Sequence, residues 1–163
     1  MSAAASTSVV IRYRVNGRDV EMLVPVRLTV AELLRDRLGL TGTKVSCEMQ
    51  VCGVCTVLVD GDPVSSCATL ACDLDGTEVL TVEGLAQGRN LHPVQEAFMS
   101  ANALQCGYCT PGFIMMAVAL LEASPDAGHR EVREWMDGNL CRCTGYEPIE
   151  AAVMVAASRR DSQ

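Results

Sequence analysis

The placement of cysteines constrains this 163-residue chain more than any other feature. Of its nine cysteines, eight fall into two sets of four. The first set has the spacing C-x4-C-x2-C-x11-C, and the second has C-x2-C, 31 intervening residues and then C-x-C. The two sets are Cys47, Cys52, Cys55 and Cys67, and Cys106, Cys109, Cys141 and Cys143. These spacings favour metal centres over a disulfide framework, which would also need an export signal.

Composition and charge exclude some locations and partners for the chain. Its first ten residues, MSAAASTSVV, contain no basic region, no long apolar stretch and no twin arginine, so we expect a reducing cytoplasm. A net charge of -7 argues against a nucleic-acid partner, which would favour a basic face. The longest apolar run, 113–121, is too short to span a bilayer and indicates a buried helix.

The first half of the chain has the signals of a small mixed sheet. Alternating apolar residues over 9–15, an Asn16-Gly17 turn and a second apolar run over 20–24 predict a β-hairpin. A capping box at Thr29 and Glu32 predicts a helix over about 30–38. Further strands are expected at 56–59 and 78–82, and the order strand, strand, helix, strand, strand suits a ferredoxin-like β-grasp.

After residues 84–92 the strand signals fade and helical signals replace them. Helices are expected at about 93–101, 110–122, 130–136 and 148–158, which can close as a small bundle. The predicted fold class is therefore α+β: a β-grasp, plant-type ferredoxin-like domain over 1–84, followed by a four-helix bundle domain over 85–163.

The first cysteine set has the ligand spacing of plant-type 2Fe-2S ferredoxins. Cys47, Cys52 and Cys55 fall in one loop, where Gly53 leaves the backbone beside a cluster free of a side chain. Zinc sites usually pair one C-x2-C with another, which this set does not do. We therefore expect a 2Fe-2S cluster here, with zinc or buried free cysteines as the alternatives.

The second set is less specific in its spacing. Cys106 and Cys109 precede a predicted helix N-terminus, where the helix dipole and free amides favour thiolates. Cys141 and Cys143 would point the same way from an extended stretch. Spacing alone leaves both a 2Fe-2S cluster and a zinc ion open.

The neighbouring residues carry a family resemblance. The stretches 105–112 (QCGYCTPG) and 138–146 (GNLCRCTGY), with 52–57 (CGVCTV) and 91–98 (LHPVQEAF), resemble the small iron–sulfur subunit of molybdenum hydroxylases. That family includes carbon monoxide dehydrogenase, aldehyde oxidoreductases, xanthine dehydrogenases and N-heteroaromatic hydroxylases. The resemblance covers nearly the whole chain, and it implies a second 2Fe-2S cluster at Cys106, Cys109, Cys141 and Cys143.

The resemblance also implies partners and a direction of electron flow. It implies a large subunit that binds molybdopterin, favouring the cytosine dinucleotide form, and a medium subunit that binds FAD, in a dimer of heterotrimers. Electrons would pass from molybdenum to the helical-domain cluster, then to the β-grasp cluster and to FAD. Gln105 and Cys143 are the positions expected to touch the pterin, and this chain would hold no catalytic residue.

Some features depart from the family or leave alternatives. Where family members often have glycine around the first cysteine, this chain has Ser46 and the loop Glu48-Met49-Gln50-Val51, so a modified backbone is expected there. Cys72 is expected to be a small buried hydrophobic residue. Gln105 could instead cap a helix end. The alternatives in function are a stand-alone two-cluster electron carrier and a zinc-binding assembly module.

Overall fold

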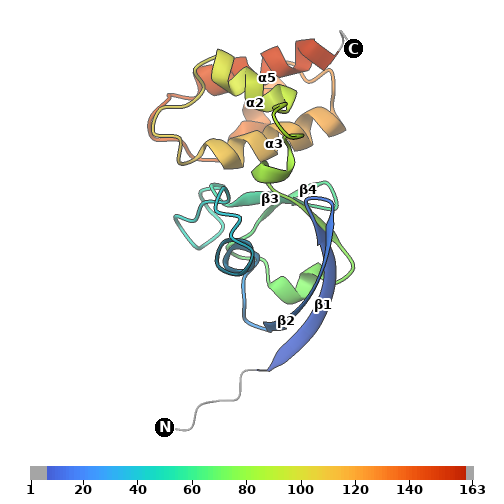
Figure 1. The fold of residues 1–163 in the computed structure, drawn as a ribbon. Coiled ribbons are helices and arrows are strands. Elements are labelled where there is room, and N and C mark those ends of the chain that lie inside the picture. The colour runs from blue at the N-terminus through green and yellow to red at the C-terminus, as the bar shows by residue number, and fades with distance from the viewer. Residues whose placement is uncertain (1–6, 161–163) are drawn as a thin grey trace.

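The structure, a computed structural model, describes residues 7–160 and has two halves (Figure 1). The first half of the chain forms a five-stranded sheet, and the second half forms helices α2 to α5, which lie together at one end of the sheet. The expected mixture of α and β structure is confirmed.

The sheet begins with the predicted hairpin. Strands β1 (Ser8–Val15) and β2 (Arg18–Pro25) pair antiparallel around Asn16 and Gly17. Both turn residues have positive φ, 50° and 76°, as a type I′ turn requires. On β1 the side chains of Ile11, Tyr13 and Val15 are buried while their neighbours face solvent, so alternation places one face of the hairpin on the core.

Three short strands complete the sheet in the order β2-β1-β5-β3-β4. They are β3 (Thr56–Val59), β4 (Asp62–Ser65) and β5 (Glu78–Leu80). β5 runs parallel to β1 and antiparallel to β3, whereas β3 and β4 form a hairpin. Two 3₁₀ turns, Ala71–Leu74 and Val82–Gly84, flank β5.

The helix expected over about 30–38 has an irregular form. The capping box is present, since Thr29 Oγ1 accepts from the Glu32 amide while Glu32 accepts from the Thr29 amide. However, α1 (Val30–Glu32) passes directly into a π-helical stretch, Leu33–Arg37, closed by the Leu38 amide on the Leu33 carbonyl. Leu33 and Leu34 are both fully buried against the sheet, and burial of these two side chains accompanies the departure from α-helical spacing.

The helical half contains the four helices expected from sequence. They are α2 (Pro93–Ser100), α3 (Thr110–Ala123), α4 (His129–Met136) and α5 (Glu147–Arg160). α3 is the central helix, with nine buried residues, and it contacts the other three helices as well as β3. Among the described residues, no helix has the length and apolar character needed to cross a membrane.

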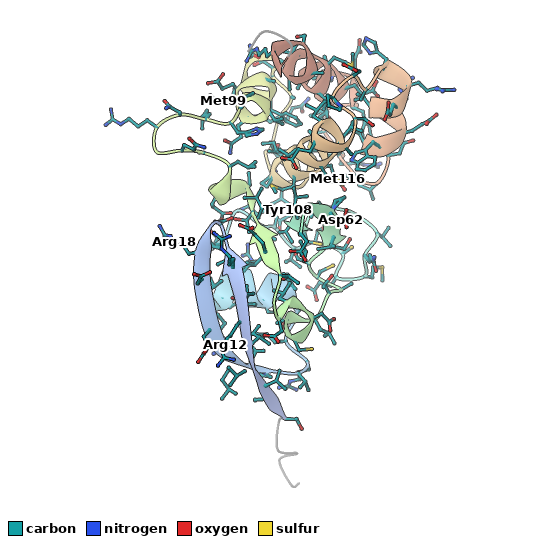
Figure 2. All side chains as sticks on the ribbon, turned by 90° about the vertical axis from the view of Figure 1, so that its right-hand side faces the viewer. Arg12, Arg18, Asp62, Met99, Tyr108 and Met116 are labelled. Carbon is teal, nitrogen blue, oxygen red and sulfur yellow. The ribbon has the colours of Figure 1, made fainter. Side chains whose placement is uncertain are left out.

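Two apolar cores form, one between the sheet and α1 and the other among α2 to α5. Leu58 belongs to the second core although it lies on β3, and it is 1% exposed. Strand β3 and the helices therefore share a packed boundary, at which Figure 2 shows Tyr108.

Candidate metal centres

Three cysteines of the first set lie in the loop between the π-helical stretch and β3, and the fourth follows β4. Cys52 and Cys55 are buried, whereas Cys47 in the same loop and Cys67, which follows β4, are half-buried. Glu48 and Gln50 adopt left-handed φ angles of 54° and 60°, and Gly53 has φ 65°. The loop thus takes positive φ at two positions without glycine, at a cost of about 1–2 kcal/mol each.

Backbone amides converge on the first thiol of this loop. The amides of Val51 and Cys52 each donate to Cys47 Sγ at 3.4 Å. A hydrogen bond from the Met49 amide, followed by those from Val51 and Cys52, lowers the pKa of Cys47 to about 6, so its thiolate form is favoured at neutral pH. Burial raises the pKa of Cys67, and the neighbouring Cys55 thiol adds to that effect.

The second set is brought together from two loops of the helical half. Cys106 and Cys109 precede α3, and Cys141 and Cys143 lie between α4 and α5. All four line one cavity of about 420 Å³, and Cys52 of the first set lines it too. Cys106 and Cys143 are exposed, Cys109 is half-buried and Cys141 is buried, so the cavity opens to solvent beside the first two.

The thiols of the second set differ in their surroundings. Burial raises the pKa of Cys109 to about 12, with a further contribution from the neighbouring Cys141 thiol. Burial also acts to raise the pKa of Cys141, but hydrogen bonds from Thr144, together with those from the Cys143 amide and the Cys109 thiol, outweigh it and the net pKa is lowered. Thr144 donates to Cys141 Sγ from its hydroxyl at 3.1 Å and from its amide at 3.4 Å. Such donors stabilise negative charge on a ligand sulfur.

The spacing of the sulfur atoms fits a two-iron cluster. Cys143 Sγ lies 3.7 Å from Cys106 Sγ. Two thiolates on one tetrahedral metal with bonds of about 2.3 Å lie roughly 3.8 Å apart. Interacting thiols occur in pairs throughout: Cys47 with Cys52, Cys55 with Cys67 and Cys109 with Cys141. A 2Fe-2S cluster needs two ligands on each of its two irons, so four cysteines arranged as two pairs suit it.

A site for a single metal ion would need a different arrangement of ligands from that of a two-iron cluster. Among residues 7–160, no group of three or more histidine, cysteine, aspartate or glutamate side chains is set to hold a single metal ion.

The two ligand loops touch each other, which the sequence did not reveal. The Leu140 amide, next to Cys141, donates to the carbonyl of Cys52 at 2.9 Å. The Tyr108 hydroxyl, between Cys106 and Cys109, donates to the carbonyl of Val45 at 2.6 Å. The only available signal was the position of Tyr108 and Leu140 beside ligands, because contacts between distant segments have no local pattern.

A second tyrosine also supports the second set. The Tyr146 hydroxyl accepts from the Cys141 amide at 3.0 Å, and its ring meets the Phe113 ring edge-on at 6.2 Å. Tyr146 has a left-handed φ of 71°, a strained conformation for a bulky residue. Local strain at this point is therefore offset by contacts that hold the Cys141 loop on the bundle.

The structure places the remaining candidates as follows. Gln105 is exposed beside Cys106, and it caps neither neighbouring helix, because the C-cap of α2 is Ala101 and the N-cap of α3 is Cys109. Cys72 is half-buried with its Sγ 3.7 Å from the Val26 carbonyl, so the expectation of a buried residue was wrong. It sits in a short 3₁₀ turn that turns one side toward solvent. All nine cysteines are free thiols.

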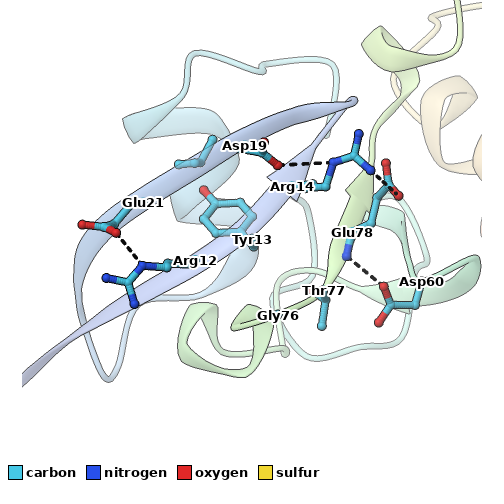
Figure 3. A pocket seen from close by; sticks show the side chains of 10 residues that line it. Arg12, Tyr13, Arg14, Asp19, Glu21, Asp60, Gly76, Thr77 and Glu78 are labelled. Atoms are coloured by element: carbon cyan, nitrogen blue, oxygen red, sulfur yellow. Dashed lines mark hydrogen bonds and ion pairs between the residues drawn. The ribbon is translucent and has the colours of Figure 1, made fainter.

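A larger cavity, of about 680 Å³, lies over the hairpin and contains no cysteine (Figure 3). Five of its charged side chains form ion pairs, Arg12 with Glu21, and Arg14 with Asp19 at 3.4 Å and Glu78 at 3.6 Å, while Asp60 accepts from the Glu78 amide at 2.8 Å. The opposite charges in these exposed pairs neutralise each other, and the cysteines lie elsewhere in the protein.

Comparison with known families divides the chain between two models. Residues 13–84 match the 2Fe-2S iron-sulfur cluster binding domain, and residues 81–154 match a second family described as the 2Fe-2S binding domain. Each matched segment contains one complete cysteine set.

Similar proteins cover almost the entire chain. The nicotine 6-hydroxylase small subunit of Paenarthrobacter nicotinovorans is 52% identical over 93% of this chain and 91% of its own length. The crystal structure of quinoline 2-oxidoreductase from Pseudomonas putida 86 has a chain that is 46% identical, with a TM-score of 0.90 over 94% of this chain and 97% of that one. Aldehyde oxidoreductase from Desulfovibrio gigas matches with a TM-score of 0.91 and 41% identity over 94% of this chain but only 17% of that protein. The chain therefore belongs to the family of small iron–sulfur subunits of the molybdenum hydroxylases.

Proposed function

We propose that this chain carries electrons through two 2Fe-2S clusters within a multi-subunit molybdenum hydroxylase. One cluster is held by Cys47, Cys52, Cys55 and Cys67, and the other by Cys106, Cys109, Cys141 and Cys143. When bound, each cluster accepts and passes on one electron at a time. The observation that carries the proposal is that the two sets lie next to each other. Cys52 of the first set lines the same cavity as all four cysteines of the second set.

The open end of that cavity is the proposed docking surface for a large, molybdopterin-binding subunit. Cys106, Cys143 and Gln105 are exposed there, and so are three apolar side chains, Leu104, Tyr108 and Leu140. Gln105 offers both a donor and an acceptor to a pterin edge, and Cys143 offers a ligand sulfur beside it. We infer a cytosine dinucleotide on that pterin.

The other end of the route is the loop of the first set. Met49 is 68% exposed and Val51 is 59% exposed, although both are apolar and both lie between Cys47 and Cys52. Apolar side chains at such positions suit contact with a partner, which we take to be a medium subunit that binds FAD. We propose one copy of each subunit per unit, two units per complex, and a cytoplasmic location, consistent with nine free thiols.

The proposed role of the chain within the enzyme is non-catalytic. The names of similar chains refer to nicotine, quinoline and aldehydes, which are chemically different substrates. A small subunit that stays this similar across such substrates is not where the substrate is recognised. We therefore assign the substrate pocket to the large partner.

We also propose that residues 1–84 form a β-grasp, ferredoxin-like domain and residues 85–163 a four-helix bundle domain, each with its own cluster, although residues 1–6 and 161–163 lie outside the part of the chain that the structure describes. The two apolar cores support this division, because one draws on residues from Ile11 to Val79 and the other on residues from Leu85 onward, with Leu58 added.

Iron and acid-labile sulfide analysis with EPR spectra tests the proposal. We expect about four irons per chain and two distinct 2Fe-2S signals. Cys67→Ala and Cys109→Ala should each lose one signal and about half of the iron, whereas the matched control Cys72→Ala should keep both. A colourless protein that binds zinc would contradict the proposal and favour an assembly module. Elution of the native chain alone in gel filtration would favour a stand-alone carrier.

The pterin contact has its own test. In the intact complex, Gln105→Ala should leave both EPR signals unchanged but slow the reduction of the second cluster by substrate or weaken retention of the pterin. Unchanged kinetics and unchanged pterin content would contradict the role assigned to Gln105.

A further inference from the structure

We propose that Asn139 is a positioning residue that locks the two ligand loops together and so sets the separation of the two clusters. It lies two residues before Cys141, at the point where the loop between α4 and α5 meets the loop of the first set. The inference rests on the proposed electron-transfer function, and it adds a structural basis for transfer between the clusters.

Asn139 is enclosed more completely than a surface loop residue would be. Its side chain is 2% exposed, and Nδ2 is buried with no hydrogen-bond partner among the described residues. A buried amide without a partner is costly and calls for an explanation. Because no hydrogen bond holds Nδ2, the contribution of this end of the side chain is its packing between the loops.

Two glycines make the space that Asn139 occupies. A Cβ on Gly53, between Cys52 and Cys55, would lie 1.7 Å from Asn139 Oδ1. A Cβ on Gly112, in the first turn of α3, would lie 3.2 Å from Asn139 Nδ2 and 2.5 Å from the Gly53 carbonyl oxygen. The Asn139 amide therefore fits between the first ligand loop and the start of the helix that follows Cys109.

Two hydrogen bonds run alongside this contact. The Leu140 amide donates to the Cys52 carbonyl at 2.9 Å, and the Tyr108 hydroxyl donates to the Val45 carbonyl at 2.6 Å. All three contacts join residues that neighbour ligands of different sets. The relative position of the ligand loops is thus fixed by direct contact, independently of the connection over residues 85–92.

Position matters here because the rate of electron transfer falls steeply with the distance between redox centres. A small displacement of one loop against the other would change the separation without removing any ligand. Asn139 would then affect transfer while leaving cluster content unchanged.

The glycines provide matched variants. Gly112→Ala adds one methyl group against the Gly53 backbone, which cannot yield as a flexible side chain could. Gly138→Ala is the control, because its Cβ would meet Met116 Cε at 3.6 Å, an ordinary contact, and Gly138 does not have positive φ. Asn139→Ala removes the amide and adds no atoms.

The experiment uses the complete complex with both clusters reduced, and measures iron content and the magnetic splitting between the two EPR signals. Wild type and Gly138→Ala should show the same splitting and about four irons per chain. Gly112→Ala and Asn139→Ala should keep that iron but show a smaller or altered splitting, with slower electron transfer between the clusters.

The outcomes separate the two proposals. Wild-type protein without four irons would contradict the proposed function itself. Either of two results would overturn the positioning role of Asn139. One is two intact clusters with no splitting in wild type, and the other is the wild-type splitting retained in both Gly112→Ala and Asn139→Ala. If Gly112→Ala lost a cluster, Asn139→Ala alone would decide, because it introduces no clash.

Discussion

Leu140 donates its backbone amide to the carbonyl oxygen of Cys52 at 2.9 Å, which links the residue beside one ligand to a ligand of the other set. The bond forms because α4 ends at Met136 and the following loop crosses the first ligand loop. Residues in the two ligand loops and in the sheet provide specific tests of this structure.

Thr144 donates two hydrogen bonds to Cys141 Sγ, so its hydroxyl should tune the second cluster. Replacing Thr144 with Val keeps the shape but removes the hydroxyl donor at 3.1 Å. Because donors to ligand sulfur stabilise the reduced, more negative cluster, we expect a lower reduction potential for the second cluster alone. A redox titration followed by EPR measures both potentials, and an unchanged second potential would show that the donor has no such effect.

The Tyr108 hydroxyl connects the two halves of the protein. Tyr108→Phe removes its bond to the Val45 carbonyl and should lower the free energy of unfolding by about 1 kcal/mol. This corresponds to a fall of roughly 2–4 °C in Tm for a chain of this size. Thermal denaturation at fixed cluster occupancy measures the change, and a Tm equal to that of wild type would mean that solvent replaces the bond fully.

Tyr13 should respond in the opposite direction to the same substitution. Its hydroxyl is buried with no hydrogen-bond partner among the described residues. Tyr13→Phe removes the unsatisfied group without leaving a cavity, so we expect stability to rise by about 1 kcal/mol. A lower Tm in Tyr13→Phe would indicate that the hydroxyl has a partner in solution.

The same residue predicts a pH dependence. Burial raises the pKa of Tyr13 to about 12 from its ordinary value of 10.0. The unfolded chain therefore loses this proton at lower pH than the folded chain, so the ionisation of Tyr13 leaves folding stability unchanged below pH 10 and lowers it as pH rises from 10 toward 12. The free energy of unfolding, measured by denaturant titration from pH 9 to 12, should fall less steeply in Tyr13→Phe than in wild type.

Glu48 occupies a left-handed conformation that glycine adopts without strain. Glu48→Gly should raise stability by up to about 1 kcal/mol, with part of the gain offset by the greater freedom of glycine in the unfolded chain. Glu48→Val is the matched contrast, since a β-branched residue at φ 54° should destabilise the loop. Equal Tm values for the two variants would show that the loop does not hold this angle in solution.

Local signals predicted most of the secondary structure, but not the contacts between segments. The Asn16-Gly17 turn and the Thr29–Glu32 capping box each depend on residues within one turn of chain, and both are present as expected. The π-helical stretch Leu33–Arg37 was not predicted, because the burial of Leu33 and Leu34 depends on the sheet beneath them.

The candidate site divides in the same way. Cysteine spacing predicted a 2Fe-2S site for the first set, whereas the second set also needed the family resemblance of its neighbouring residues, because its two halves are 31 residues apart. The seat of Asn139 between Gly53 and Gly112 has no such pattern, since it joins three segments that are far apart in sequence. Glycine at those two positions is explained only once the opposing loop is in place.

Leu58 couples the folding of the two halves of the chain. Its side chain is 1% exposed on a strand of the sheet yet packs within the core of the helices, so either half alone would present this apolar surface to water. We therefore expect the chain to melt in a single cooperative transition. The sheet domain therefore cannot be exchanged freely. A free-standing ferredoxin put in its place would need a residue that fills the position of Leu58.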